Sequence, residues 1–103
     1  MSTLHTVNKS PFERNSLKTC LSLCKTDSSV LLIEDAVIGA LQNALISKQI
    51  LEAVASGVKV YALKEDLAAR GMPLSRLIDG ISIVDYAGFV DLAVKNTKVQ
   101  CWL

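Results

Sequence analysis

Three cysteines and one histidine are the residues of this sequence that are suited to nucleophilic chemistry. Cys20 and Cys24 lie four positions apart, Cys101 lies near the C-terminus and His5 near the N-terminus. A cysteine reacts as its thiolate, which attacks carbon electrophiles or a second sulfur atom. The sequence has no CxxC motif and only one imidazole, so a disulfide framework or a zinc site lacks partners. The chemistry left for this chain is therefore that of a free thiol, or none. No metal or cofactor is expected.

The first two cysteines fall in a predicted helix from Ser10 to about Lys25, with Ser10 as its N-cap. Apolar residues recur along it at helical spacing and predict one stripe that faces a sheet: Leu17, Cys20, Leu21 and Cys24. Such a stripe predicts shielded thiols that pack as small hydrophobes. Cys20 lies at the margin of the stripe, which leaves access from a partner open. Cys24, Cys101 and the strand residue His5 are predicted to be structural.

Acidic residues follow the predicted strands, where ligands bind in open parallel sheets. They are Glu34, Asp35, Glu65, Asp66 and Asp85. No GxGxxG or GxxxxGK[ST] turn accompanies them, and their charge repels phosphate, so nucleotide or flavin binding is disfavoured. Helix capping is the favoured role of these acids, with an acidic metal site as the alternative.

The elements that position these residues alternate between short β-branched runs and helix-length segments. Strands are predicted at Thr3–Val7, Val30–Ile33, Val58–Leu63, Ile81–Val84 and Val99–Trp102, and further helices at Ala36–Ala55, Glu65–Gly71 and Tyr86–Lys95. This alternation predicts one domain over residues 1–103, of the α/β class. We expect a three-layer α/β/α sandwich around a mainly parallel five-stranded sheet, similar to flavodoxin-like proteins.

The predicted helix Ala36–Ala55 is long enough to span a bilayer but contains polar residues, so we expect a water-exposed helix and no membrane contact. On a helical wheel Leu41 and Leu45 lie on one side and Ile46 and Ile50 nearly opposite, and this predicts a protein partner. The 11 basic and 10 acidic residues give a net charge of +1, too small to hold a polyanion. Direct nucleic-acid binding is therefore not expected. With no signal-peptide pattern and unpaired cysteines, a cytoplasmic location is expected.

Several motifs in order resemble the DsrH/TusB family over nearly the whole chain. They are Leu4–Phe12, Ile33–Asp35, Val60–Leu67 with Ala69–Gly71, Val84–Val90 and Gln100–Leu103. The resemblance implies a subunit of a sulfur relay, in which sulfur passes between proteins as cysteine persulfides. It also implies a cytoplasmic hetero-hexamer with DsrE/TusD-type and DsrF/TusC-type partners, and transient contact with sulfur-carrier proteins.

Cys20 matches a cysteine that is typical of the sulfur-oxidising, DsrH-like branch and commonly missing from the tRNA-thiolating, TusB-like branch. The resemblance therefore favours dissimilatory sulfur oxidation and makes Cys20 the candidate persulfide acceptor. Two alternatives stay open. One is a TusB-like subunit for 2-thiolation of the tRNA wobble uridine, and the other is a purely structural subunit that supports a catalytic DsrE/TusD-type partner.

Overall fold

The computed structural model describes residues 2–10, 16–40 and 46–102. Within them, five strands form one sheet in which every neighbouring pair is parallel. The strands are β1 (Thr3–Val7), β2 (Ser29–Leu32), β3 (Lys59–Leu63), β4 (Ile81–Val84) and β5 (Lys98–Trp102). The predicted α/β class and parallel five-stranded sheet are confirmed.

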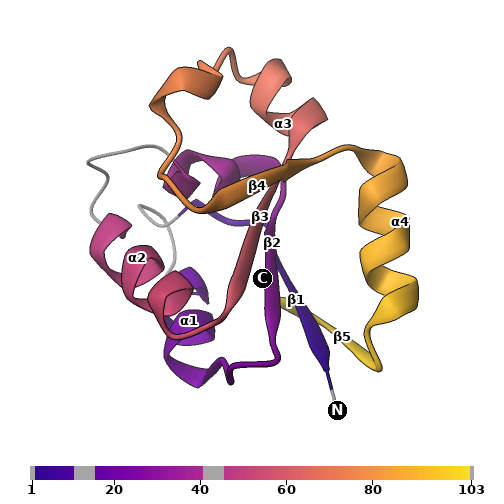
Figure 1. The fold of residues 1–103 in the computed structure, drawn as a ribbon. Coiled ribbons are helices and arrows are strands. Elements are labelled where there is room, and N and C mark those ends of the chain that lie inside the picture. Colours follow the sequence, from indigo (N-terminus) through magenta and orange to yellow (C-terminus); the bar gives the residue numbers. More distant parts are fainter. Residues whose placement is uncertain (1, 11–15, 41–45, 103) are drawn as a thin grey trace.

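The strand order is β4-β3-β2-β1-β5, which sequence patterns did not predict. Three successive connections step across the sheet in one direction, and the last returns to the opposite edge. Crossovers between parallel strands are right-handed, so reversing the direction moves the connecting helix to the other face. Accordingly α1 (Ser16–Leu23) and α2 (Ser47–Ala55) lie on one side of the sheet, and α4 (Tyr86–Lys95) lies on the other (Figure 1).

The two faces of the sheet are covered unequally. Side chains alternate between faces along each strand, and paired residues of parallel strands share a face. On the α1/α2 face, Val7, Val30 and Val60 belong to one large apolar cluster with Ile50 of α2 and Leu17 of α1. On the other face α4 has no fully buried residue. The main core therefore lies between the sheet and α1/α2.

The predicted helix Ala36–Ala55 is wrong as one continuous element. The structure instead has a 3₁₀ helix, η1 (Glu34–Ala40), and then α2, which begins at Ser47. The carbonyl of Ala40, the last residue of η1, accepts a bond of 2.8 Å from the amide of Ile78. Residues 41–45, which include two leucines used in the wheel argument, lie outside the described residues. The argument for two opposed apolar faces therefore no longer applies.

Local signals at the other helix ends are largely confirmed. Gly57 follows α2 with φ +103°, a left-handed conformation that glycine adopts readily. Asp85 caps α4, because its Oδ1 accepts a bond of 2.8 Å from the amide of Gly88. The helix α3 (Lys64–Ala69) and a 3₁₀ turn, η2 (Leu74–Arg76), complete the described elements. The predicted N-terminal part of the first helix lies mostly at 11–15, outside the described residues.

Candidate functional site: a thiol pair on α1

The predicted apolar stripe of the first helix is present and places two cysteines side by side. Leu17, Cys20 and Leu21 are buried against the sheet, and Cys24 packs against the same cluster just beyond the end of α1. The side chain of Cys20 is completely buried, with 0% of its surface exposed, whereas Cys24 is partly exposed. A reagent in solution can therefore reach Cys24 but not Cys20 in this conformation.

A hydrogen bond between the thiols of Cys20 and Cys24 shifts their pKa values in opposite directions. The hydrogen bond with Cys24, together with burial, raises the pKa of the Cys20 thiol. The same hydrogen bond lowers the pKa of the Cys24 thiol, and burial only partly opposes it. Cys20 therefore keeps its proton and donates a hydrogen bond to the sulfur of Cys24. The i, i+4 spacing signalled this proximity, but the sequence did not indicate which sulfur is reachable.

His5 and Trp102 join the neighbouring strands β1 and β5 on the α1/α2 face. Trp102 Nε1 donates a bond of 3.1 Å to His5 Nδ1, and the ring centroids are 6.2 Å apart. His5 is 7% exposed. Burial, and then the charge of Lys98, lower the pKa of the His5 imidazole. His5 therefore acts as a neutral acceptor within the fold, in keeping with the predicted packing role.

The third cysteine, Cys101, is exposed on β5, which is an edge strand of the sheet. It shares the α4 face with Val99, while Gln100 and Trp102 point to the other face, as the alternation of the sequence predicts. The sheet lies between Cys101 and the pair formed by Cys20 and Cys24. Cys101 therefore cannot act together with that pair within one molecule.

Most of the acids at the carboxyl edge of the sheet make structural contacts through their carboxylates. Asp35 receives two bonds from the guanidinium of Arg70, at 2.8 and 3.1 Å. Asp66 accepts the amide of Glu34, which has a left-handed φ of +50°. Glu65 accepts the amide of Tyr86 at 3.4 Å, near the start of α4. Among residues 2–10, 16–40 and 46–102, no group of three or more His, Cys, Asp or Glu side chains is placed to hold a metal ion.

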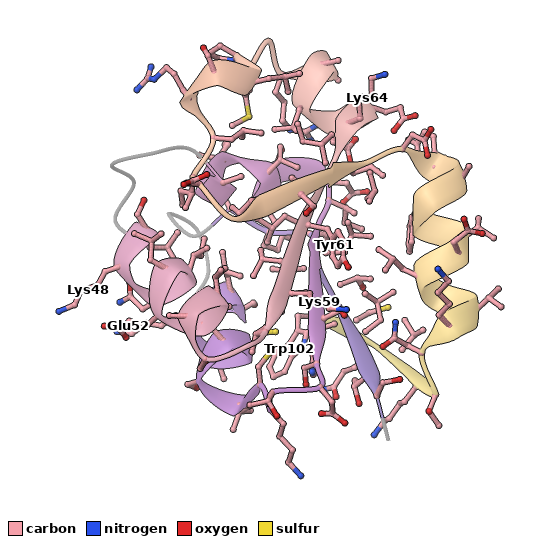
Figure 2. The ribbon with its side chains drawn as sticks, viewed as in Figure 1. Lys48, Glu52, Lys59, Tyr61, Lys64 and Trp102 are labelled. Carbon is pink, nitrogen blue, oxygen red and sulfur yellow. The ribbon has the colours of Figure 1, made fainter. Side chains whose placement is uncertain are left out.

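A cavity of about 440 Å³, not expected from the sequence, lies between α4 and the amino ends of β2 and β3. Figure 2 shows Lys59 and Tyr61 extending from β3 on the side of α4. The cavity opens far from the carboxyl edge, where ligands of parallel sheets usually bind. The residues that line it are Ser2, Thr26, Asp27, Ser28, Ser29, Lys59, Tyr61, Leu92, Lys95 and Asn96.

The helix α4 exposes an apolar stripe formed by Tyr86, Val90 and Val94, spaced four residues apart. Val94, an aliphatic residue in the last turn of α4, is 79% exposed. Contiguous apolar surface of this kind on a small domain is typical of protein–protein contact. In the described part of the chain, no helix is both long and apolar enough to cross a bilayer.

The fold and the thiol pair define a class of protein: a small, all-parallel α/β domain whose reactive groups are cysteines and whose surface is suited to assembly. Comparison with known proteins narrows this class. A family model described as DsrH like protein matches residues 9–99. Protein TusB of Erwinia tasmaniensis is 38% identical over 99 residues, which cover 96% of this chain and 99% of that protein.

Protein TusB of Buchnera aphidicola subsp. Baizongia pistaciae is 33% identical over the same shares of the two chains. The chain belongs to the DsrH/TusB family of sulfur-relay subunits, as its motifs indicated. Members of this family are parts of multi-subunit sulfur-relay complexes.

Solved structures show the same architecture. The ychN protein from E. coli superimposes with a TM-score of 0.82 at 25% identity and covers 98% of this chain and 99% of its own. A protein of unknown function from Methanobacterium thermoautotrophicum gives a TM-score of 0.76 at 16% identity, with 96% of each chain covered. This second likeness concerns the fold alone.

Proposed function

We propose that this chain is a subunit of a cytoplasmic sulfurtransferase complex that passes persulfide sulfur between proteins, in the DsrH-like setting of dissimilatory sulfur oxidation. The observation that carries the proposal is the thiol pair formed by Cys20 of α1 and Cys24, just beyond the end of α1, in a member of the DsrH/TusB family. Cys20, which resembles the cysteine of the sulfur-oxidising branch, enters the proposal as a sulfur-handling residue. Its burial means that α1 must move, or a neighbouring thiol must take part, before a partner's sulfur reaches it.

The proposed partners are DsrE/TusD-type and DsrF/TusC-type subunits in a hetero-hexamer, with sulfur-carrier proteins as transient partners. The exposed stripe of α4 supports such an assembly, because Val90 and Val94 would be covered in it. The open edge strand β5, with Val99 and Cys101 exposed, offers a second surface of this kind. Net charge near zero supports contact with proteins rather than with nucleic acid.

A TusB-like role in 2-thiolation of the tRNA wobble uridine is the second candidate. It is favoured by the curated relatives, which are named TusB and are up to 38% identical. Deleting the gene separates the two pathways. Loss of sulfur oxidation with normal tRNA thiolation supports the proposal, and loss of 2-thiouridine from tRNA supports the second candidate.

Mass spectrometry of the intact complex tests whether this subunit handles sulfur at all. After incubation with a persulfide donor, the wild-type subunit should gain the mass of one sulfur atom. A variant with Cys20, Cys24 and Cys101 all replaced by serine should gain none while still assembling. A wild-type subunit that never gains sulfur, although its partners do, would leave a purely structural role.

A further inference from the structure

The end of α1 holds Cys24 in a fixed place relative to Cys20. The amide of Cys24 donates to the carbonyl of Leu21 at 3.4 Å. In the turn that follows, the Lys25 amide donates to Ser28 Oγ at 3.2 Å, and the Ser28 amide donates to the Lys25 carbonyl at 2.9 Å. The backbone on both sides of Cys24 is therefore tied down. Its side chain lies beside that of Cys20, and the residue is partly exposed.

Burial assigns different roles to the two thiols. A charge on the fully buried Cys20 is costly, so Cys20 stays neutral. Its S–H then points at the sulfur of Cys24, and a hydrogen bond to a charged acceptor is stronger than one to a neutral acceptor. The helix itself does not help, because the carboxyl end of α1 carries partial negative charge. The anionic form of Cys24 is therefore stabilised mainly by Cys20.

We propose that Cys24 is the thiol of this subunit that accepts sulfur from a persulfide donor, and that Cys20 is the positioning residue that donates a hydrogen bond to it. This inference rests on the proposed function and deepens it by naming the sulfur of Cys24, in place of that of Cys20, as the reacting atom. It also gives a physical role to Cys20 that agrees with its complete burial.

The transfer step is a balanced thiol exchange with no external oxidant. The Cys24 thiolate attacks the terminal sulfur of a donor persulfide, R–S–SH, and a new S–S bond forms at Cys24. The S–S bond of the donor breaks, and the donor leaves as the thiolate R–S⁻. The proton stays on the transferred sulfur, so the products are Cys24–S–SH and R–S⁻. The Cys20 thiol keeps its proton throughout.

The first test measures how fast each cysteine of the folded full-length chain reacts with iodoacetamide across a pH series. Cys24 should react, and the midpoint of its rate profile should lie below that of a cysteine in an unstructured peptide. Cys20 should stay unmodified. Cys20→Ala removes the donor and should slow Cys24 about tenfold at neutral pH, the effect of losing one hydrogen bond to a charged group.

Cys20→Ser is the matched control, because a serine hydroxyl also donates a hydrogen bond at nearly the same size. It should restore most of the Cys24 reaction rate that Cys20→Ala loses. The rate of the exposed Cys101, measured in the same sample, is the internal reference. Equal Cys24 rates in the two variants would overturn the role of Cys20. If Cys20→Ala does not fold, the wild-type midpoint compared with the peptide decides: an unshifted midpoint overturns the role of Cys20.

The second test locates the transferred sulfur after incubation with inorganic polysulfide. Cys20 and Cys24 share the tryptic peptide 19–25, so fragment ions must separate them. Added sulfur on Cys24, retained in Cys20→Ser and lost in Cys24→Ser, supports the inference. Sulfur on Cys20 overturns the inference but leaves the proposed function standing. Sulfur on neither residue overturns the inference and removes the support for sulfur handling by this subunit.

Discussion

Replacing Trp102 with phenylalanine should destabilise the fold through a single hydrogen bond. Trp102 Nε1 donates to His5 Nδ1 at 3.1 Å, and His5 is buried. Phenylalanine keeps an aromatic ring but cannot donate, so Nδ1 loses this partner within the fold. Leaving a buried acceptor unsatisfied costs about 1–3 kcal/mol. The smaller ring also loses apolar contact, and that loss must be measured separately.

A double-mutant cycle separates the two contributions. The four proteins are the wild type, Trp102→Phe, His5→Phe and the double variant, each unfolded in urea at about pH 8, where an imidazole is neutral. Far-UV circular dichroism is the signal, because Trp102 is the only tryptophan of the chain. We expect a coupling free energy of about 1 kcal/mol or more. A coupling within about 0.3 kcal/mol of zero would refute the assignment of this bond.

The burial of His5, with the nearby charge of Lys98, makes the stability of the fold depend on pH. The pKa of His5 is lowered from 6.5 in the folded state, so below pH 6.5 the unfolded chain binds the proton more strongly. The contribution of His5 is therefore complete above pH 6.5 and decreases as the pH falls below it. The difference in unfolding free energy between wild type and His5→Phe should shrink as the solution becomes acidic. A difference that grows on acidification would contradict the lowered pKa.

Gly80→Ala should cost about 2 kcal/mol, because its φ is +98° and a new Cβ would lie 3.0 Å from Val54 Cγ1. Gly71→Ala, with φ +63° and open space around it, should cost only about 1 kcal/mol, and equal losses in thermal unfolding would count against the close approach. Asp85→Ala removes the cap of α4 and should lower the urea stability by about 1 kcal/mol, whereas Asp85→Asn should keep most of it. The isolated chain should self-associate in sedimentation velocity, and Val94→Lys should reduce this without changing stability; a monomeric wild type would speak against the stripe as a contact surface.

Local patterns in this sequence predicted its elements well, since several depend on near neighbours alone. The strand Thr3–Val7 and the helix Tyr86–Lys95 have the predicted bounds, because alternation and an Asp cap are local signals. The break between η1 and α2 was missed, because it involves a bond between Ala40 and Ile78, which are far apart in sequence. The strand order was not predicted either, because it too depends on contacts between residues far apart in sequence.

The candidate site, too, could be predicted from the sequence only in part. The periodicity of α1 predicted that Cys20 and Cys24 share one face with Leu17 and Leu21, and this is confirmed. The degree of burial of each thiol depends on how α1 sits on the sheet and on its turn at Ser28, which no spacing in the sequence encodes. Cys20, placed at the margin of the stripe by its angle, is fully covered in the structure.

The strand order also determines which surfaces a partner can cover without blocking the thiols. The single return crossover places α4 on the face opposite α1 and α2 (Figure 1), with Val90 and Val94 exposed. Cys24 packs against the apolar cluster of α1 and α2, and these two helices lie on the opposite side of the sheet from α4 (Figure 1). A subunit bound to the α4 stripe is therefore separated from Cys24 by the thickness of the sheet. Stable assembly through α4 leaves the thiol pair open to a second, transient protein, as a relay between proteins requires.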